Sequence, residues 1–424
     1  MAGEQGRRTD PLPQRWLSVI GSDPSRELRI VRGDGAQVWD DESRQYLDLV
    51  TGGGVNVLGH AHPQFVSALE SQLRTLASVQ ADFGHDAQEE FVEALSLAMP
   101  DGLTRMVITN SASEAVDAAV RLACAATGRT QIVAADGALH GSTLLGSLLS
   151  DVRDVAPTPL NLDLVRVPYD DIAALERSLN DRVAAVIVEP MQWGTVARAP
   201  AAGYLTEVKA LCRATGCLLI VDEVQTALRT WPPLLSSRQQ VLPDIVCLGS
   251  SIANGFPIGA AVAGDAVVVP AAAAIRGGTT AGIPLACAAG AATLRTLADA
   301  AIRTRVNESG DRLQQRLRAL RIAQIKRVTG EGTLASVELH ADAPGVVRGM
   351  RDNGLLVRPS VSGEIRLVPP SVIEPRQVDE IVEGLAAAIL ESRHSRRRRP
   401  DDTREVELRG VAARPKRGAN RPPS

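Results

Sequence analysis

The sequence predicts an α/β protein built around a mainly parallel sheet. Short apolar runs alternate with amphipathic segments from about residue 85 to residue 262. Several of these runs end in polar or small residues, as strands do at the ligand-binding edge of an open sheet. The 424-residue chain also combines 45% hydrophobic residues with a net charge of −3. That length and balance indicate a large core and two closely packed domains.

Seven runs have the length and apolar content of buried strands. Amphipathic helices are expected between them at 113–127, 172–179 and 204–215, the last ending before Gly216. This alternation predicts helices on both faces of a seven-stranded sheet. The strands are expected at 106–109, 132–134, 164–167, 183–188, 218–221, 245–248 and 258–262.

Both ends of the chain are expected to build a smaller α+β domain beside this sheet. Residues 26–60, with a hairpin pattern, form its N-terminal part, and residues 286–391 form its C-terminal part. Residues 61–285 form the large domain. Residues 1–25 are expected to be a flexible arm, and the charged, Pro-rich segment 392–424 a disordered basic tail.

The composition excludes several classes of protein. A net charge of −3 gives no reason to expect nucleic acid or a membrane as a partner of the body. Five scattered cysteines without CxxC spacing indicate reduced thiols in the cytoplasm, and no residues are singled out as metal ligands. The most apolar stretch, 258–275, is interrupted by Asp265 and Pro270, so no transmembrane helix is expected.

The stretch 217–260 contains the motifs IVDEVQTA and CLGSSIANGFPIGA. It holds two predicted strands, one ending in Asp222 and the other in the turn 249–255. With these motifs the chain resembles the class III aminotransferases, which are pyridoxal-phosphate (PLP) enzymes of fold type I, over about residues 25–390. The resemblance implies the PLP-dependent transferase fold, with a mainly parallel seven-stranded sheet and a smaller α+β domain.

The resemblance assigns cofactor positions near Asp222. In the family the aspartate of the DEVQTG motif lies beside the pyridine nitrogen of PLP, where a buried carboxylate favours the protonated ring. Gln225 matches the glutamine beside the phenolic oxygen of the cofactor. The alternative for Asp222 is a carboxylate that caps a strand end or pairs with an arginine.

The segment TNSASEA matches the family's phosphate-binding turn. Ser111, Ala112 and Ser113 stand at a predicted helix N-terminus, where backbone N–H groups bind anions. Ala112 replaces a glycine, and the alternative is an ordinary N-cap. Thr279 matches the threonine that reaches the phosphate from a neighbouring subunit, which implies a homodimer or a heterodimer.

The substrate side of the resemblance centres on Arg366. It matches the arginine that grips a substrate carboxylate in relatives that act on amino acids, and the alternative is an ion pair with Glu364. His140 and Glu189 follow the family pattern. Gly194 stands where many relatives carry a glutamate that neutralises this arginine.

Two further departures affect the chemistry. Leu139 stands where an aromatic residue usually stacks on the cofactor ring, and Ser250 stands where the family carries the lysine that holds PLP covalently. A serine hydroxyl forms no imine and cannot replace an amine as a proton carrier. The three lysines, Lys209, Lys326 and Lys416, are not placed by sequence to reach Ser250.

These departures lead to the expectation of a class III aminotransferase-like protein deficient in ordinary transamination. It would be a degenerate paralogue or a partner subunit, as a homodimer or with an active paralogue, and would hold PLP or pyridoxamine phosphate (PMP) non-covalently if at all. One alternative is an active PLP- or PMP-dependent aminotransferase with unusual chemistry, in which His140 or His62 carries the proton. Another is a non-catalytic module that binds an amino acid or amine.

Overall fold

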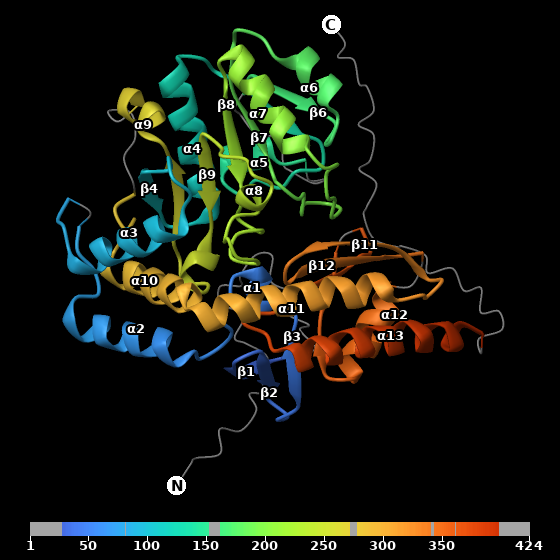
Figure 1. Cartoon of the computed structure of the whole chain (residues 1–424). Coiled ribbons are helices and arrows are strands. Elements are labelled where there is room, and N and C mark those ends of the chain that lie inside the picture. Colours follow the sequence, from blue (N-terminus) through green and yellow to red (C-terminus); the bar gives the residue numbers. More distant parts are fainter. Residues whose placement is uncertain are drawn as a thin grey trace, which may run out of the picture.

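The computed structural model describes residues 28–80, 82–151, 162–271, 278–340, 343–360 and 362–397 (Figure 1). The predicted N-terminal arm, most of the predicted basic tail and Lys416 lie outside these residues. Helix α13 (Pro375–Arg397) continues past residue 392, where the tail was predicted to begin.

A seven-stranded sheet forms the centre of the larger part, as predicted. Strand β10 runs antiparallel to both of its neighbours, and the remaining strands run parallel to one another. Each predicted strand matches an observed one to within a residue at either end; the strand expected at 258–262 is displaced as a whole by one residue. The order is β4 (Arg105–Thr109), β10 (Gly259–Ala263), β9 (Ile245–Leu248), β8 (Leu218–Asp222), β7 (Val183–Val188), β5 (Gln131–Ala135) and β6 (Leu164–Val167).

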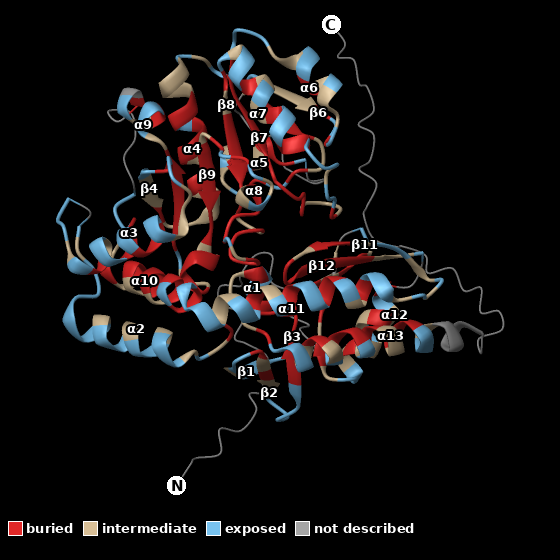
Figure 2. Cartoon of the chain, viewed as in Figure 1, coloured by how far each residue is buried: buried red, intermediate tan, exposed pale blue. Residues whose placement is uncertain are grey.

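Helices cover both faces of this sheet because successive strand residues point to opposite sides. Side chains such as Ile187 and Ile220 pack against α4 (Ala112–Thr127), and their neighbours Val188 and Leu219 pack against α7 (Tyr204–Thr215). Figure 2 shows the central strands buried between helices with exposed outer faces. The other helices here are α2 (Pro63–Thr75), α3 (Asp86–Ala98), α5 (Leu144–Leu149), α6 (Ile172–Ser178), α8 (Leu235–Arg238), α9 (Asp265–Ala271), α10 (Pro284–Ala298) and the 3₁₀ turn η1 (Ser250–Ala253).

The smaller part, as far as the structure describes it, contains two four-stranded sheets and the helices α11 (Ala300–Ala319), α12 (Ala343–Asp352) and α13. Strand β3 pairs in parallel with β13, which brings the two ends of the chain into one sheet. The domain boundaries themselves stay a prediction. The first sheet is β1 (Ile30–Asp34), β2 (Gln37–Asp40), β3 (Gln45–Asp48) and β13 (Leu355–Leu356); the second is β11 (Ile325–Glu331), β12 (Leu334–Leu339), β15 (Ile365–Leu367) and β14 (Arg358–Pro359); the helices pack with them.

The two parts meet around the short turn α1 (Thr51–Gly54). Arg229, which is fully buried, donates hydrogen bonds to the carbonyl oxygens of Gly54 and Pro369. Burial lowers the pKa of Arg229 to about 10. One guanidinium therefore connects the loop after β8 to two segments of the smaller part.

None of the described helices taken singly has both the length and the apolar character that would let it cross a membrane. The bent pair α10–α11, with 76° between its two helices, meets both criteria by length and composition only.

Candidate functional site

A buried carboxylate marks the carboxyl end of the central strand. Asp222 is the last residue of β8, and its Oδ2 lies 2.8 Å from Nδ1 of His140. Its Oδ1 accepts a hydrogen bond of 3.1 Å from the backbone N–H of Val224. Both side chains are almost completely removed from solvent. These contacts fix the orientation of the Asp222 carboxylate while one nitrogen of His140, Nε2, is left buried without a partner among the described residues.

His140 belongs to the loop that follows β5. Its backbone N–H donates to Oγ of Ser150 at 2.8 Å. A Cβ atom at the next residue, Gly141, would lie 2.5 Å from Oγ of Ser113, and its φ is +122°, so this position requires glycine. The loop therefore comes close enough for the backbone N–H of Ser142 to donate to Ser113 Oγ at 3.0 Å.

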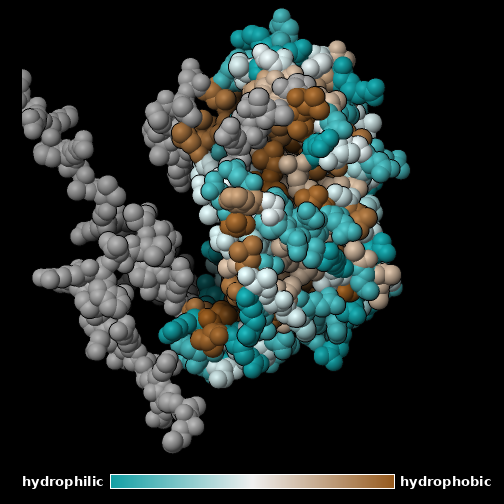
Figure 3. All heavy atoms as spheres, turned by 90° about the vertical axis from the view of Figure 1, so that its left-hand side faces the viewer, coloured by the Kyte–Doolittle hydropathy of each residue, from teal (hydrophilic) through white to brown (hydrophobic). Residues whose placement is uncertain are grey.

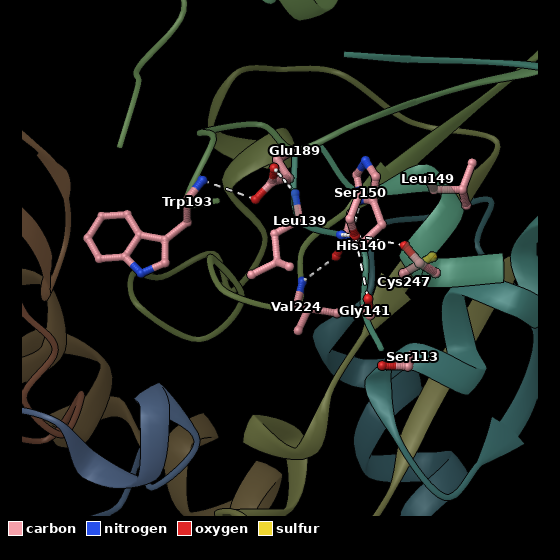
Figure 4. Close-up of polar contacts among 12 residues, drawn as sticks. Ser113, Leu139, His140, Gly141, Leu149, Ser150, Glu189, Trp193, Val224 and Cys247 are labelled. Carbon is pink, nitrogen blue, oxygen red and sulfur yellow. Dashed lines mark hydrogen bonds and ion pairs between the residues drawn. The ribbon is translucent and has the colours of Figure 1, made fainter. Parts of the chain in front are cut away.

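Glu189 follows β7 and lies beside this pair. Its two carboxylate oxygens accept hydrogen bonds from the backbone N–H groups of Trp193, at 3.0 Å, and Leu139, at 3.3 Å (Figure 4). Burial nevertheless raises the pKa of Glu189 to about 7, because desolvation of the charged form outweighs these bonds and the attraction of His140. The site thus contains a carboxyl group that titrates near neutral pH.

The N-terminus of α4 supplies the next wall. Ser111 is its N-cap, and Ser111 Oγ accepts a hydrogen bond of 3.2 Å from the backbone N–H of Glu114. The alternative role predicted for this serine is therefore present. Ala112 and Ser113, in the first turn, face the loop of His140.

These elements enclose a cavity of about 300 Å³. That volume is at the lower end of the range typical of small-molecule sites. The cavity brings together seven of the predicted site residues, and it adds Gly141, Ser142 and Val224. It is lined by Ala112, Ser113, Leu139, His140, Gly141, Ser142, Glu189, Asp222, Val224 and Gln225. We refer to it as the Asp222 cavity.

A second cavity of about 230 Å³ adjoins the first, because Leu139 and Gln225 line both. Its other walls come from α1, β14 and β15 and include Trp193 and Arg366. The Arg366 guanidinium donates to the carbonyl oxygens of Trp193 at 2.9 Å and Gly194 at 2.6 Å. It lies 5.0 Å from the centroid of the Trp193 ring. We refer to this space as the Arg366 cavity.

The structure gives a steric reason for the glycine at 194. A Cβ atom there would lie 2.2 Å from the carbonyl oxygen of Gly137. A glutamate cannot occupy this position in the chain as it is folded. The carboxylate nearest to Arg366 is instead the buried Glu364, at 3.7 Å.

Five residues singled out from the sequence are absent from the described lining of the Asp222 cavity, namely Ser111, Ser250, Thr279, Arg366 and His62. Ser250 opens η1, and its Oγ donates to the carbonyl oxygen of Ile258 at 3.2 Å. The preceding Gly249 touches the wall of the cavity, since a Cβ atom there would lie 3.0 Å from both Ala112 and Val224. Thr279 is exposed in the single chain, and His62 precedes α2.

The two described lysines have other partners. Nζ of Lys209 lies 2.7 Å from Asp244, and Nζ of Lys326 lies 2.5 Å from Glu338. Neither is among the described residues that line the Asp222 or Arg366 cavity.

Sequence reasoning missed Arg358, which also lines the Arg366 cavity. A signal was present: Arg358 and Arg366 flank a short turn-forming segment, and residues on either side of a hairpin come to lie opposite each other.

This fold and this pair of cavities define a small-molecule enzyme site at the carboxyl edge of an open α/β sheet. The model of the family described as Aminotransferase class-III matches residues 20–389. The chain therefore belongs to the class III aminotransferases, and the predicted fold type I is confirmed.

Individual relatives with aminotransferase names support the same family assignment. The acetylornithine aminotransferase of Methanopyrus kandleri is 37% identical over 371 residues, which cover 86% of this chain and 95% of that protein. The acetylornithine aminotransferase of Methanosarcina acetivorans is 35% identical over 396 residues, covering 91% and 98%. The ornithine aminotransferase of Toxoplasma gondii, solved with partial occupancy of PLP at its active site, superposes with a TM-score of 0.82 at 29% identity, covering 90% and 93%.

The prediction of a protein deficient in ordinary transamination, acting as a degenerate paralogue or a partner subunit, is wrong. Identity of 35–37% to acetylornithine aminotransferases extends along nearly the whole chain. The prediction gave too much weight to a few positions and too little to the remainder of the site. The findings favour the alternative, an active aminotransferase.

The prediction of PLP or PMP as cofactor is confirmed for the family. The residues of the Asp222 cavity fit such a group. It offers a buried carboxylate, an unpartnered buried imidazole nitrogen and the N-terminus of a 16-residue helix, which suits a phosphate.

Proposed function

We propose that this chain is an active aminotransferase that moves an amino group between an amino acid or amine and a 2-oxo acid or aldehyde. The observation that carries the proposal is the junction of two cavities through Leu139 and Gln225, one suited to the cofactor and the other lined by arginine. The names of the relatives make acetylornithine the first amino donor to test.

In this proposal the chain binds the cofactor through residues already placed around the Asp222 cavity. Asp222 would hold the pyridine nitrogen, Ser113 and the first turn of α4 would hold the phosphate, and Gln225 would lie by the phenolic oxygen. Leu139 would offer the ring an apolar surface. When bound, PLP supplies an electron sink for the carbon that loses its proton.

Ser250 is proposed to stand where relatives carry the covalent lysine, so that the cofactor is held by non-covalent contacts. Proton transfer then needs another group. Nδ1 of His140 lies 2.8 Å from Oδ2 of Asp222, and its other ring nitrogen, Nε2, has no partner among the described residues. We assign proton transfer to this nitrogen.

The chain is further proposed to form a homodimer, in which Thr279 reaches the phosphate of the partner's site. Large apolar side chains are exposed on one side of the molecule, on α2, α3 and the loop between them. Figure 3, which faces the side where these helices lie, shows apolar surface interspersed with polar side chains. The most exposed are Leu73 at 57%, Phe83 at 62% and Leu97 at 79%. Burial of such a surface favours association.

The test is a single-turnover reaction. The purified full chain is loaded with PLP, mixed with acetylornithine and monitored for conversion of PLP to PMP by absorbance. We expect conversion, followed by regeneration of PLP on addition of 2-oxoglutarate. Absence of conversion with acetylornithine and with glutamate, while the cofactor raises the melting temperature, would contradict the proposal.

A Ser250→Lys variant tests the position of the missing amine. We expect it to retain a phosphopyridoxyl group after borohydride reduction, detected as a mass increase on residue 250. Ser67→Lys, on an exposed position of α2, is the matched control and should acquire none. If both variants are labelled equally, or neither is, Ser250 does not occupy the lysine position.

A further inference from the structure

Two arginines face each other across the strands that line the Arg366 cavity. The Cα atoms of Arg358, on β14, and Arg366, on β15, are direct antiparallel partners. Directly opposite residues project from the same face of a sheet, and like charges in such a pair are destabilising. Both side chains line the same cavity. The arrangement therefore calls for a negative charge between them.

The protein supplies little of that charge. Arg366 donates to two backbone carbonyl oxygens, which accept hydrogen bonds but carry no net charge. Glu364 lies 3.7 Å from Arg366 and also accepts the backbone N–H of Ala197 at 3.1 Å. Among the described residues, the buried carboxylate next to this pair of arginines thus lies beside Arg366 and not beside Arg358.

Arg358 differs from Arg366 in its hydrogen bonding. It is exposed, and among the described residues it has no hydrogen bond or ion-pair partner. The cavity it lines opens beside Leu139 and Gln225, which also border the Asp222 cavity. A substrate bound next to the cofactor would therefore extend toward a free, fork-shaped cation that can bind a carboxylate with two hydrogen bonds.

We propose that Arg358 is a specificity-determining residue that receives a carboxylate of the substrate, with Arg366 held against the wall by backbone carbonyls. The inference rests on the proposed function, and it names the ligand chemistry of the same site: an acid with a second negative group is favoured over one with a single carboxylate. Arg358 acts in binding and takes no part in proton transfer.

Binding of glutarate, a dicarboxylate, and butyrate, a monocarboxylate, to the PLP-loaded full chain tests this by isothermal titration calorimetry. Wild type should prefer glutarate. Arg358→Gln should weaken glutarate binding about 10- to 100-fold, the effect of losing a charge-assisted bidentate contact, and remove most of the preference over butyrate. Arg358→Lys, which keeps the charge but loses the fork, should lie between the two.

The matched control is Arg376→Gln, since Arg376 is 86% exposed on α13 and pairs there with Glu380. It should bind glutarate as wild type does. Wild-type affinity in Arg358→Gln, an equal loss in Arg376→Gln, or no preference for glutarate in wild type would each overturn the inference. Calorimetry needs no turnover, so failure of the proposed amino transfer is seen separately in the absorbance assay.

Discussion

The two ends of the seven-stranded sheet carry cavities of opposite character. The cavity at the amino end of β8 and β9 has a volume of about 600 Å³, twice that of the Asp222 cavity, and contains Lys209. Yet Lys209 is paired with Asp244, which also accepts the backbone N–H of Leu219 at 2.8 Å. At the carboxyl end lie buried Asp222, His140 and Glu189, and Nε2 of His140 has no partner among the described residues. The comparison teaches that the candidate functional site is marked by buried polar groups that lie close together. Neither the volume of a cavity nor the presence of a lysine marks it.

The largest expected effect on amino transfer comes from removing the carboxylate charge of Asp222 in the Asp222 cavity. Asp222→Asn keeps the shape but loses the anion that pairs with His140 and that is proposed to hold the cofactor. We expect amino transfer to fall by about 10²- to 10⁴-fold, in the range for removal of an electrostatic or proton-transfer group. Steady-state rates with acetylornithine measure this. The matched change at the opposite end, Asp244→Asn, should leave the rate unchanged; equal losses in the two variants would erase the contrast.

A smaller effect is expected on stability through Glu189. Its pKa is about 7 in the folded protein, against 4.5 as the ordinary value. Between these pH values the folded state keeps a proton that the unfolded chain releases, so the free energy of unfolding falls as pH rises. The loss amounts to about 3 kcal/mol relative to Glu189→Gln.

Urea unfolding of wild type and Glu189→Gln at pH 5 and pH 8 measures this difference. Asp379→Asn serves as a control without a pH response in this range: the hydrogen bond from Arg312 holds the pKa of Asp379 below its ordinary value of 3.8, so this carboxyl is ionised in the folded and the unfolded chain at both pH values. A stability difference between wild type and Glu189→Gln that is constant with pH would show that Glu189 stays ionised.

The smallest effect is expected at the amino end. Lys209→Gln breaks an ion pair whose two side chains are 21% and 25% exposed, and Asp244 keeps its backbone hydrogen bond. We expect a loss of at most about 1 kcal/mol in the free energy of unfolding and an unchanged rate of amino transfer. Loss of a borohydride-fixed phosphopyridoxyl adduct in this variant would instead identify Lys209 as the covalent anchor.

Several features of the site could be predicted from the chain alone. Asp222 and Glu189 directly follow apolar runs of strand length, so their place at the carboxyl edge follows from periodicity. Ser111 and Ser113 precede a clear helical pattern, which fixes them at an N-terminus. The contact between His140 and Asp222 could not be predicted in this way, because 82 residues separate them and only the parallel pairing of the strands brings their loops together.

The error about activity has a related cause. Ser250, Leu139 and Gly194 were weighed as separate losses of side-chain chemistry. In three dimensions Gly194 is demanded by the carbonyl oxygen of Gly137, and Leu139 forms a wall common to two cavities. Residues that look degenerate in a one-dimensional motif can be parts of a differently shaped site.

The amino-acid sequence alone predicts the order of strands and helices, the seven-stranded sheet and the family to which the chain belongs. These features follow from the spacing of apolar residues and from short motifs, which each involve only a few neighbouring residues. Three other features depend on the tertiary structure: that the two cavities join, that His140 pairs with Asp222, and that Arg358 lies opposite Arg366. These contacts join loops and strands whose approach depends on packing across the whole sheet, which no local pattern specifies.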